Sequence, residues 1–379
     1  KKDDATTDKD KEQQESQASS ALTGILNQAF VTYGSTEAKA DTTIGSSAVI
    51  TATAVKDGNT NTTAGGDLTI TATSNAANTA KLTVRPEVEK DKTSYAEAFT
   101  GGLIYEDNVS HATVNVDGIL TSAGKTDIEA NATSKVAASM GLRNSVYASD
   151  KDSTNDKKDP TTVPSLATIA VGVNSQDSKA EVNIGKKNDK ATVTAGKNLN
   201  VNVTTTNEMT SAVMALNNDN TTLSTTVNVA SSNGSASVNN AGKLISNEGN
   251  VDIQATENLN KLDVITGNAF SDNLYEGAEA VFNSKVYYDE PISKKFSPLA
   301  QLLYAQNQYA PGKNVSISGD TWKNYFDVGA AISVSNVTNT AQVNLDESSR
   351  IQSKGDTAID AGVTIGDVRN ITSHVLQIS

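Results

Sequence analysis

The stretch AEVNIGKKNDKATVTAGKNLNVNV, residues 180–203, contains both sequence elements that decide the fold of this chain. The first element, Ala180–Ile184, reads Ala, any residue, Val, Asn and then an apolar residue. The second element begins at Gly196 and alternates apolar and polar residues up to Val203. Alternation with a period of two, together with abundant Val, Ile and Thr, is typical of β-strands.

Both elements recur along the chain, which is the mark of a repeat protein. The first element returns at Ala112–Val116, Ala236–Asn240 and Ala341–Leu345, and a degenerate copy stands at Ala40–Ile44. We expect the glycine that starts each second element to provide the positive φ of a turn between two strands. These glycines are Gly65, Gly124, Gly196, Gly249, Gly312 and Gly355.

A third apolar block precedes the first element, at 166–173, 223–229 and 328–334. Short strands of small residues, joined by Gly and Asn corners, predict an all-β fold, a parallel β-solenoid whose turns stack on one another. With two turns in each unit, the chain would hold roughly 12–15 turns and stand ~60–70 Å tall at the usual strand spacing. The Asn of the first element is expected to form a side-chain ladder at a corner. An antiparallel sandwich of repeated hairpins is the alternative fold.

The repeats leave room for a lead-in and for insertions. Residues 1–20 are charged and low in complexity, which predicts a disordered or flexible lead-in. Residues 21–379 are expected to be one β-solenoid segment of a longer chain, starting with a short helix at 21–30. Insertions are expected at about 85–108, 143–165 and 268–311. Because each follows the strand of a second element, all should lie at one face or edge, as a binding face or as surface loops of drifting length.

The last insertion differs from the others in composition. Eleven of the 17 aromatic residues lie between Phe270 and Phe326, and Ser297-Pro298 predicts the start of a small helical excursion. These aromatic side chains form either a small core that packs the insertion against the solenoid or a recognition patch for a ligand. The candidate patch residues are Phe282, Tyr287, Tyr288, Phe296, Tyr304, Tyr309, Trp322 and Tyr325.

Composition excludes several classes of function. The chain has no Cys and only two His, so it offers no thiolate metal site and no cysteine nucleophile. Its net charge of −13 argues against binding the backbone of a nucleic acid, and its apolar runs are far shorter than the ~18 residues of a membrane span. The Asp residues in 150–159 are expected to lie in a solvated loop rather than to bind calcium. We predict no catalytic, cofactor-binding or metal-binding residue.

Three stretches, 64–72, 191–199 and 330–345, resemble the haemagglutination-type repeats of very large filamentous exoproteins of Gram-negative bacteria. The order of an apolar strand, then Ala-x-Val-Asn, then Ala-Gly-Asp/Asn-Leu is similar to the leukotoxin-type filamentous adhesins in particular. The resemblance covers most of the chain outside the lead-in and the three long insertions. It implies a right-handed parallel β-helix, export by a type V route and residence outside the cell or at the bacterial cell surface.

The resemblance also implies a function. The chain would be a non-catalytic structural and binding segment of a large secreted adhesin or leukotoxin, a virulence factor in contact with host cells. Its partners would be a host-cell surface protein or glycan and the rest of the same exoprotein, with no cofactor and no nucleic acid. Two alternatives are a β-helix enzyme that degrades acidic polysaccharides through clustered carboxylates, and a passive spacer without a ligand of its own.

Overall fold

The computed structural model describes residues 29–56, 63–84, 99–144, 167–186, 191–217, 223–270 and 328–376. The expected lead-in, the expected helical excursion at Ser297, the Asp residues of 150–159 and all eight candidate patch residues lie outside the described residues. Within the expected N-terminal helix, Ala29 and Phe30 instead belong to the first strand.

The chain follows the same path five times. In each turn a long strand of a rising sheet leads to a short strand of a bridging sheet and then to a long strand of a returning sheet. The rising sheet contains β1 (Ala29–Ile44), β6 (Phe99–Val116), β9 (Ala167–Ile184), β12 (Leu223–Asn240) and β15 (Val328–Leu345). The bridging sheet contains β2 (Val49–Ala52), β7 (Ile119–Ser122), β10 (Thr192–Ala195), β13 (Lys243–Ser246) and β16 (Arg350–Gln352). The returning sheet contains β5 (Leu68–Val84), β8 (Thr126–Asn144), β11 (Leu199–Asn217), β14 (Val251–Phe270) and β17 (Thr357–Leu376).

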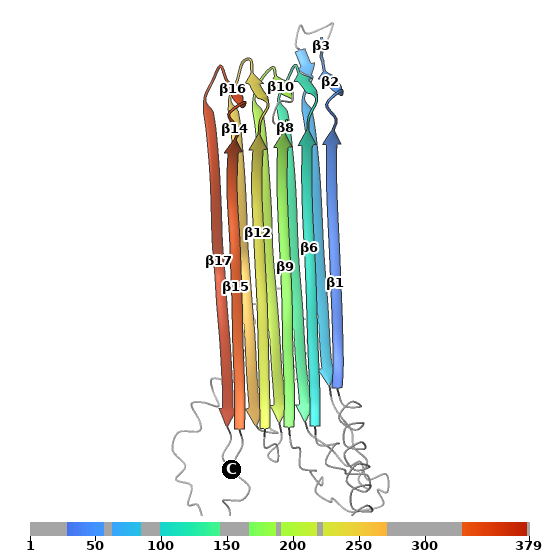
Figure 1. Ribbon diagram of the computed structural model, residues 1–379, viewed down its shortest axis with the longest axis vertical. Helices are drawn as coiled ribbons and strands as arrows, with labels where there is room; N and C mark the ends of the chain where they lie inside the picture. The colour runs from blue at the N-terminus through green and yellow to red at the C-terminus, as the bar shows by residue number, and fades with distance from the viewer. Residues whose placement is uncertain are drawn as a thin grey trace, which may run out of the picture.

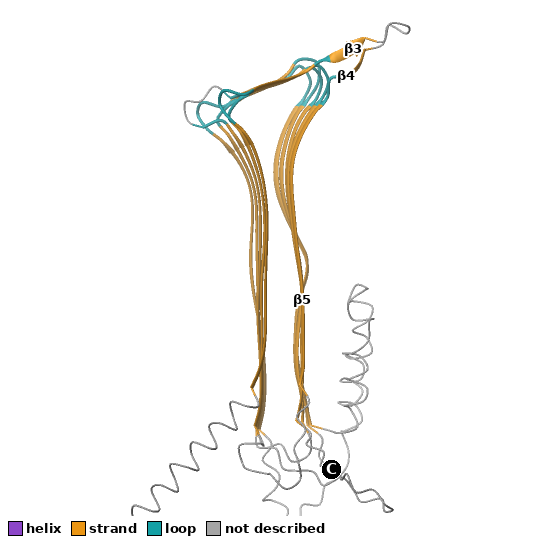
Figure 2. Ribbon diagram, turned by 90° about the vertical axis from the view of Figure 1, so that its right-hand side faces the viewer, coloured by secondary structure: helices purple, strands orange, loops and turns teal. Residues whose placement is uncertain are grey.

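The two long sheets lie face to face, and the short strands join them at one end, which we term the bridged end (Figures 1 and 2). Every pairing inside these three sheets is parallel and links strands of successive turns. The two views together show the rising strands in front of the returning strands in Figure 1, while the chain advances from right to left, so the solenoid is right-handed. The predicted parallel β-solenoid is confirmed, and only β3 (Ala54–Lys56) and β4 (Thr63–Gly65) among the described strands pair antiparallel.

The expected number of turns is wrong. Each unit makes one turn, and the described chain makes five turns instead of the expected 12–15. Five strands at the usual spacing give a stack only about 20 Å thick, whereas each long strand extends for roughly 60 Å. The miscount arose because the third apolar block and the first element, expected to be separate strands, are two halves of one strand, as in β9.

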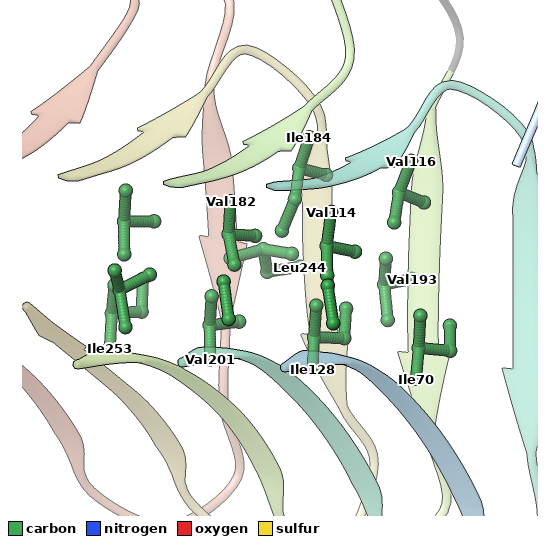
Figure 3. Close-up of a cluster of buried hydrophobic side chains, with 14 of the residues drawn as sticks. Ile70, Val114, Val116, Ile128, Val182, Ile184, Val193, Val201, Leu244 and Ile253 are labelled. Atoms are coloured by element: carbon green, nitrogen blue, oxygen red, sulfur yellow. The ribbon is translucent and has the colours of Figure 1, made fainter. Parts of the chain in front are cut away.

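The apolar cluster at the bridged end forms where side chains of all three sheets meet. Figure 3 shows Val182 of β9, Leu244 of β13 and Ile253 of β14 pointing into this shared interior. The register places the first element of every turn in the same rows, including the degenerate copy, since Ala40 pairs with Ala112. The alanine row continues through the remaining turns as Ala180, Ala236 and Ala341.

Away from the bridged end, the interior combines apolar and polar side chains. Two smaller apolar clusters lie there, one that includes Met140 and Leu142 and one that includes Met209 and Leu262. The two long sheets lie closer together there than at the bridged end (Figure 2), so short polar side chains reach across. Ser110 Oγ donates a hydrogen bond to Ser74 Oγ at 2.9 Å, and Asn108 Nδ2 donates to Ser134 Oγ at 2.7 Å. Asn228 joins the sheets in the same way, because Ser211 Oγ donates to its Oδ1 at 2.6 Å.

Buried polar residues in this part of the interior explain why the first insertion was predicted to be longer than it is. β6 begins at Phe99, so residues 99–108 of the expected 85–108 insertion form strand. The inward positions Glu106 and Asn108 are fully buried, yet they are polar. They interrupt the apolar alternation that marks a strand in sequence.

The role expected for the repeated glycines is correct only in the first turn. Gly65 and Gly66 have positive φ, but Gly124, Gly196, Gly249 and Gly355 do not. These later glycines are needed because the turns approach one another closely. A Cβ on Gly196, for example, would lie 2.6 Å from the carbonyl carbon of Ala123 in the preceding turn. Gly312, the remaining expected turn, lies outside the described residues.

The predicted asparagine ladder is confirmed, although it lies on the outer face of the rising sheet rather than at a corner. Asn183 Nδ2 donates to Asn115 Oδ1 at 3.0 Å, and Asn239 Nδ2 donates to Asn183 Oδ1 at 2.9 Å. Asn344 Nδ2 extends the ladder by donating to Asn239 Oδ1 at 2.8 Å. Each rung is the penultimate residue of its strand, so the ladder fixes the register between turns just before the chain leaves the sheet.

We expect Asn183→Ala to destabilise the fold by about 1–2 kcal/mol, because the substitution removes the donor to Asn115 and the acceptor for Asn239. The measurement is urea unfolding followed by circular dichroism. The matched control is Asn336→Ala, at an exposed position of the same sheet. Equal effects of the two substitutions would show that the ladder contributes nothing beyond an ordinary surface asparagine.

Candidate functional site

The outer face of the rising sheet carries an exposed apolar surface, which we term the outer stripe. It consists of two neighbouring rows, each with one residue from every turn. The first row contains Val31, Leu103, Val171, Val227 and Ile332. The second row contains Tyr33, Tyr105, Val173, Val229 and Val334.

The outer stripe forms because the apolar residues in the two halves of each rising strand lie on opposite faces of the sheet. In β9, Val171 and Val173 occupy odd positions, whereas Ala180 and Val182 occupy even positions. Because successive residues of a strand point to opposite faces, the two groups must face opposite ways. The even group fills the apolar core, so the odd group faces outward.

The side chains at the two ends of the stripe are the most accessible. Tyr33 is 68% exposed and Val31 is 65% exposed, while Ile332 and Val334 are 49% and 45% exposed. The rings of Tyr33 and Tyr105 stack with their centroids 5.4 Å apart and their planes nearly parallel, at 4°. A contiguous apolar surface of this kind marks an interaction site more often than it marks ordinary protein surface.

The stripe lies near the end opposite the bridged end, where the insertions join the solenoid. The returning strands β5, β8, β11 and β14 all end there, and the next rising strand starts there in each turn. The expectation that every insertion point lies at one edge is therefore confirmed for the strand ends that flank them. The segment that carries the candidate aromatic patch leaves β14 at Phe270 and re-enters at Val328, four residues before Ile332 of the stripe.

Toward the bridged end, the outer face of the rising sheet is polar and charged. It carries the asparagine ladder and close ion pairs between neighbours on one strand, such as Lys179 Nζ with Glu181 Oε2 at 3.0 Å. His111 lies within β6, with Nε2 3.2 Å from Asp177 Oδ2 of β9. These polar partners satisfy one another, so this half of the face offers less to a ligand than the stripe.

The corner between the bridging and returning sheets forms a second polar surface. It is lined by Asp67, Lys125, Lys197, Asn198 and Glu248. Lys125 Nζ lies 2.9 Å from Asp127 Oδ2, and the backbone N–H of Lys125 donates to Asp67 Oδ1 at 2.8 Å. The carboxylate beside it raises the pKa of Lys125, so this ammonium is held in an ion pair at the corner.

The described residues show no constellation suited to metal or acid–base chemistry at the surface. Within them, no group of three His, Cys, Asp or Glu residues is placed to hold a metal ion. Two carboxyl groups, Glu106 and Glu257, have a raised pKa because they are buried, and both are fully enclosed between the long sheets. They are therefore out of reach of a substrate on the outer faces.

Comparisons with known proteins identify no relative: no family model, no curated protein and no solved structure matches this chain. No helix able to span a membrane occurs in the part of the chain that the structure describes. The function must therefore be argued from the surfaces themselves.

Sequence reasoning missed the outer stripe, although the signal was available. The third apolar block is evident in the sequence but was not assigned to a face of the sheet. In each of the three copies, the Val and Ile residues of this block are an odd number of positions from the Val of the first element. In β12, for example, Val227 and Val238 are eleven positions apart. In a single uninterrupted strand, that offset predicts two faces of opposite character.

Proposed function

We propose that this chain is a structural and binding segment of a large, surface-displayed filamentous adhesin or leukotoxin of a Gram-negative bacterium. The observation that carries the proposal is the coincidence, at one end of a regular solenoid, of every described insertion joint and the exposed outer stripe. The stacked turns form a stiff support, and the stripe and the joints lie together on it. Such an arrangement suits contact with a macromolecular partner better than it suits a passive spacer.

The proposed partner is a protein or glycan on a host-cell surface. Apolar rows that include tyrosines provide the rigid contact area that dominates binding interfaces. The remaining turns of the parent exoprotein would hold this surface away from the bacterial cell. Export to the cell surface belongs to the same proposal and is supported by the repeat pattern of the sequence.

Removing the most exposed side chains at the two ends of the stripe should weaken binding without unfolding the protein. We expect Tyr33→Ser combined with Ile332→Thr to weaken binding to host cells, matrix proteins or arrayed glycans by more than about tenfold, because buried tyrosine anchors commonly contribute 2 kcal/mol or more. The melting temperature should change little, since Tyr33 is 68% exposed and Ile332 is 49% exposed, so the main loss is the stacking of Tyr33 on Tyr105. The measurement is fluorescence-detected binding of the purified chain, with melting followed by circular dichroism.

The matched control places substitutions on the polar half of the same face, with Asn336→Ala and Gln342→Ala. Unaltered binding by the stripe variant would contradict a role for the stripe, and a complete lack of binding by the unaltered chain would favour the spacer. The candidate aromatic patch needs its own variant, Tyr287→Ala with Tyr288→Ala. Loss of folding in that variant would indicate a small core, whereas loss of binding by a folded variant would indicate a recognition patch.

The same proposal makes the chain non-catalytic. Hydrolysis of a polysaccharide needs two carboxyl groups that reach the glycosidic bond. The described carboxyl groups with a raised pKa, Glu106 and Glu257, are both buried between the sheets. Turnover of an acidic polysaccharide that a single Asp or Glu substitution abolishes would overturn this part of the proposal.

A further inference from the structure

Glu257 lies in the interior, and its carboxyl group occupies the space that a side chain at Gly234 would otherwise fill. It belongs to β14 and faces Gly234 of β12 across the space between the long sheets. A Cβ on Gly234 would lie 2.7 Å from the Cδ of Glu257, so the carboxyl group fills the position that this glycine leaves open. Any larger residue at 234 would displace it.

Three further polar residues lie beside Gly234 or Glu257, each on a different strand. Gly234 pairs with Ser178 of β9 on one side and with Asn339 of β15 on the other. Thr205 of β11 pairs with Glu257 itself. We term Glu257, Ser178, Thr205 and Asn339 the Glu257 cluster.

The Glu257 cluster is buried, and its polar atoms have no partner within the protein. Glu257, Ser178 and Thr205 are fully enclosed, at 0% exposure. Neither carboxyl oxygen of Glu257 makes a hydrogen bond, and the same holds for Ser178 Oγ, Thr205 Oγ1 and both amide atoms of Asn339. A buried carboxylate without a partner is costly, by several kcal/mol in typical proteins, so something must compensate for it.

No ionisable side chain lies beside Glu257 to provide that compensation. Its neighbours in the register are Thr205 on β11 and Val363 on β17, and the facing strands contribute Ser178, Gly234 and Asn339. All of these are neutral. The compensating positive charge must therefore come from a proton or from a bound cation.

We propose that the Glu257 cluster binds one monovalent alkali cation, Na⁺ or K⁺. The cluster offers carboxylate, hydroxyl and amide oxygens from four strands, which are the ligands that hard cations prefer. Its single negative charge is neutralised by one unit of positive charge, whereas a divalent ion would leave a buried excess charge. The cation would join three successive turns and both long sheets through β9, β11, β14 and β15, and so stabilise the middle of the solenoid.

The test is thermal unfolding of the whole chain at pH 8 in NaCl, KCl or choline chloride of equal concentration. We expect Na⁺ or K⁺ to raise the melting temperature by about 4 °C relative to choline, the size of shift that saturating ligand produces in a chain of this length. The shift should disappear in Glu257→Gln, which keeps the shape of the side chain but removes its charge. It should also disappear at pH 5, where a proton occupies the carboxyl group.

Two more variants separate the site from a general salt effect. Ser178→Ala removes one oxygen and should raise the Na⁺ or K⁺ concentration needed for the half-maximal shift. Glu106→Gln removes another fully buried carboxyl group without a partner, which lies against Gly34, and should leave the part of the cation shift that depends on Glu257 intact. Equal melting temperatures in all three chlorides, a shift that persists in Glu257→Gln, or a larger shift with CaCl₂ at matched ionic strength would each overturn the proposal.

Discussion

Gly196→Ala is expected to destabilise the protein by about 3 kcal/mol or more, because a single added methyl group has no space between successive turns. A Cβ at this position would lie 2.6 Å from the carbonyl carbon of Ala123 and 3.1 Å from its Cα. These are backbone atoms of the preceding turn, so no side chain can rotate away. Relief requires the two turns to separate at the corner, where Gly196 N donates to Ser122 O at 2.8 Å.

The control for this substitution is Gly141→Ala, the same chemical change in β8. A Cβ on Gly141 meets no atom within 4 Å, and this glycine lacks a positive φ. Alanine there should be neutral or stabilise the chain by up to about 1 kcal/mol, because it reduces the flexibility of the unfolded state. Urea unfolding of the two variants gives the comparison. Similar stabilities would show that close approach between turns does not explain the repeated glycine.

Glu257→Gln is expected to make the protein more stable than the parent chain at neutral pH, by about 3 kcal/mol in choline chloride. Burial raises the pKa of Glu257 to about 7 from an ordinary value of 4.5. Between these two pH values, the unfolded chain releases the proton while the folded chain retains it. The unfolded state therefore binds fewer protons, and stability falls as the pH rises from 4.5 to about 7.

Glutamine at position 257 is neutral at every pH, so the stability of Glu257→Gln does not fall between pH 4.5 and about 7 for this reason. The measurement is the difference in unfolding free energy between Glu257→Gln and the parent chain at several pH values from 4 to 8. The difference should be smallest near pH 4, grow up to about pH 7 and then stay constant. The pKa of Glu106, also raised by burial, affects both proteins equally and cancels. A difference independent of pH would contradict a buried, protonated Glu257.

Parts of the fold were predictable because they depend on local pattern. The Ala-x-Val-Asn element predicted strands, and its recurrence predicted parallel stacking with identical residues aligned, as the Asn183 ladder shows. The position of the insertions followed in the same way, since each comes after the same strand of its unit. These features can be predicted without knowing what lies on the opposite sheet.

Other features were not predictable from local pattern. The number of turns was wrong because Glu106, Asn108 and their counterparts interrupt the apolar alternation inside a continuous strand. The role of Gly196 was misjudged because the contact that demands glycine lies in another turn, 73 residues earlier in the chain. The eight candidate patch residues stay a prediction, as they lie outside the described residues.

The sequence by itself therefore determined that the chain builds stacked, parallel turns of β-strands, because period-two alternation and repeated rows are properties of neighbouring residues. Only the tertiary structure decided which side of each long strand faces inward. Close to the bridging strands the two long sheets diverge around Val, Leu and Ile side chains, whereas farther away they approach and small polar groups bond across between smaller apolar clusters (Figure 2). In that half, Val171 and Val173 lie on the outer face, where they form part of the surface proposed to bind a partner.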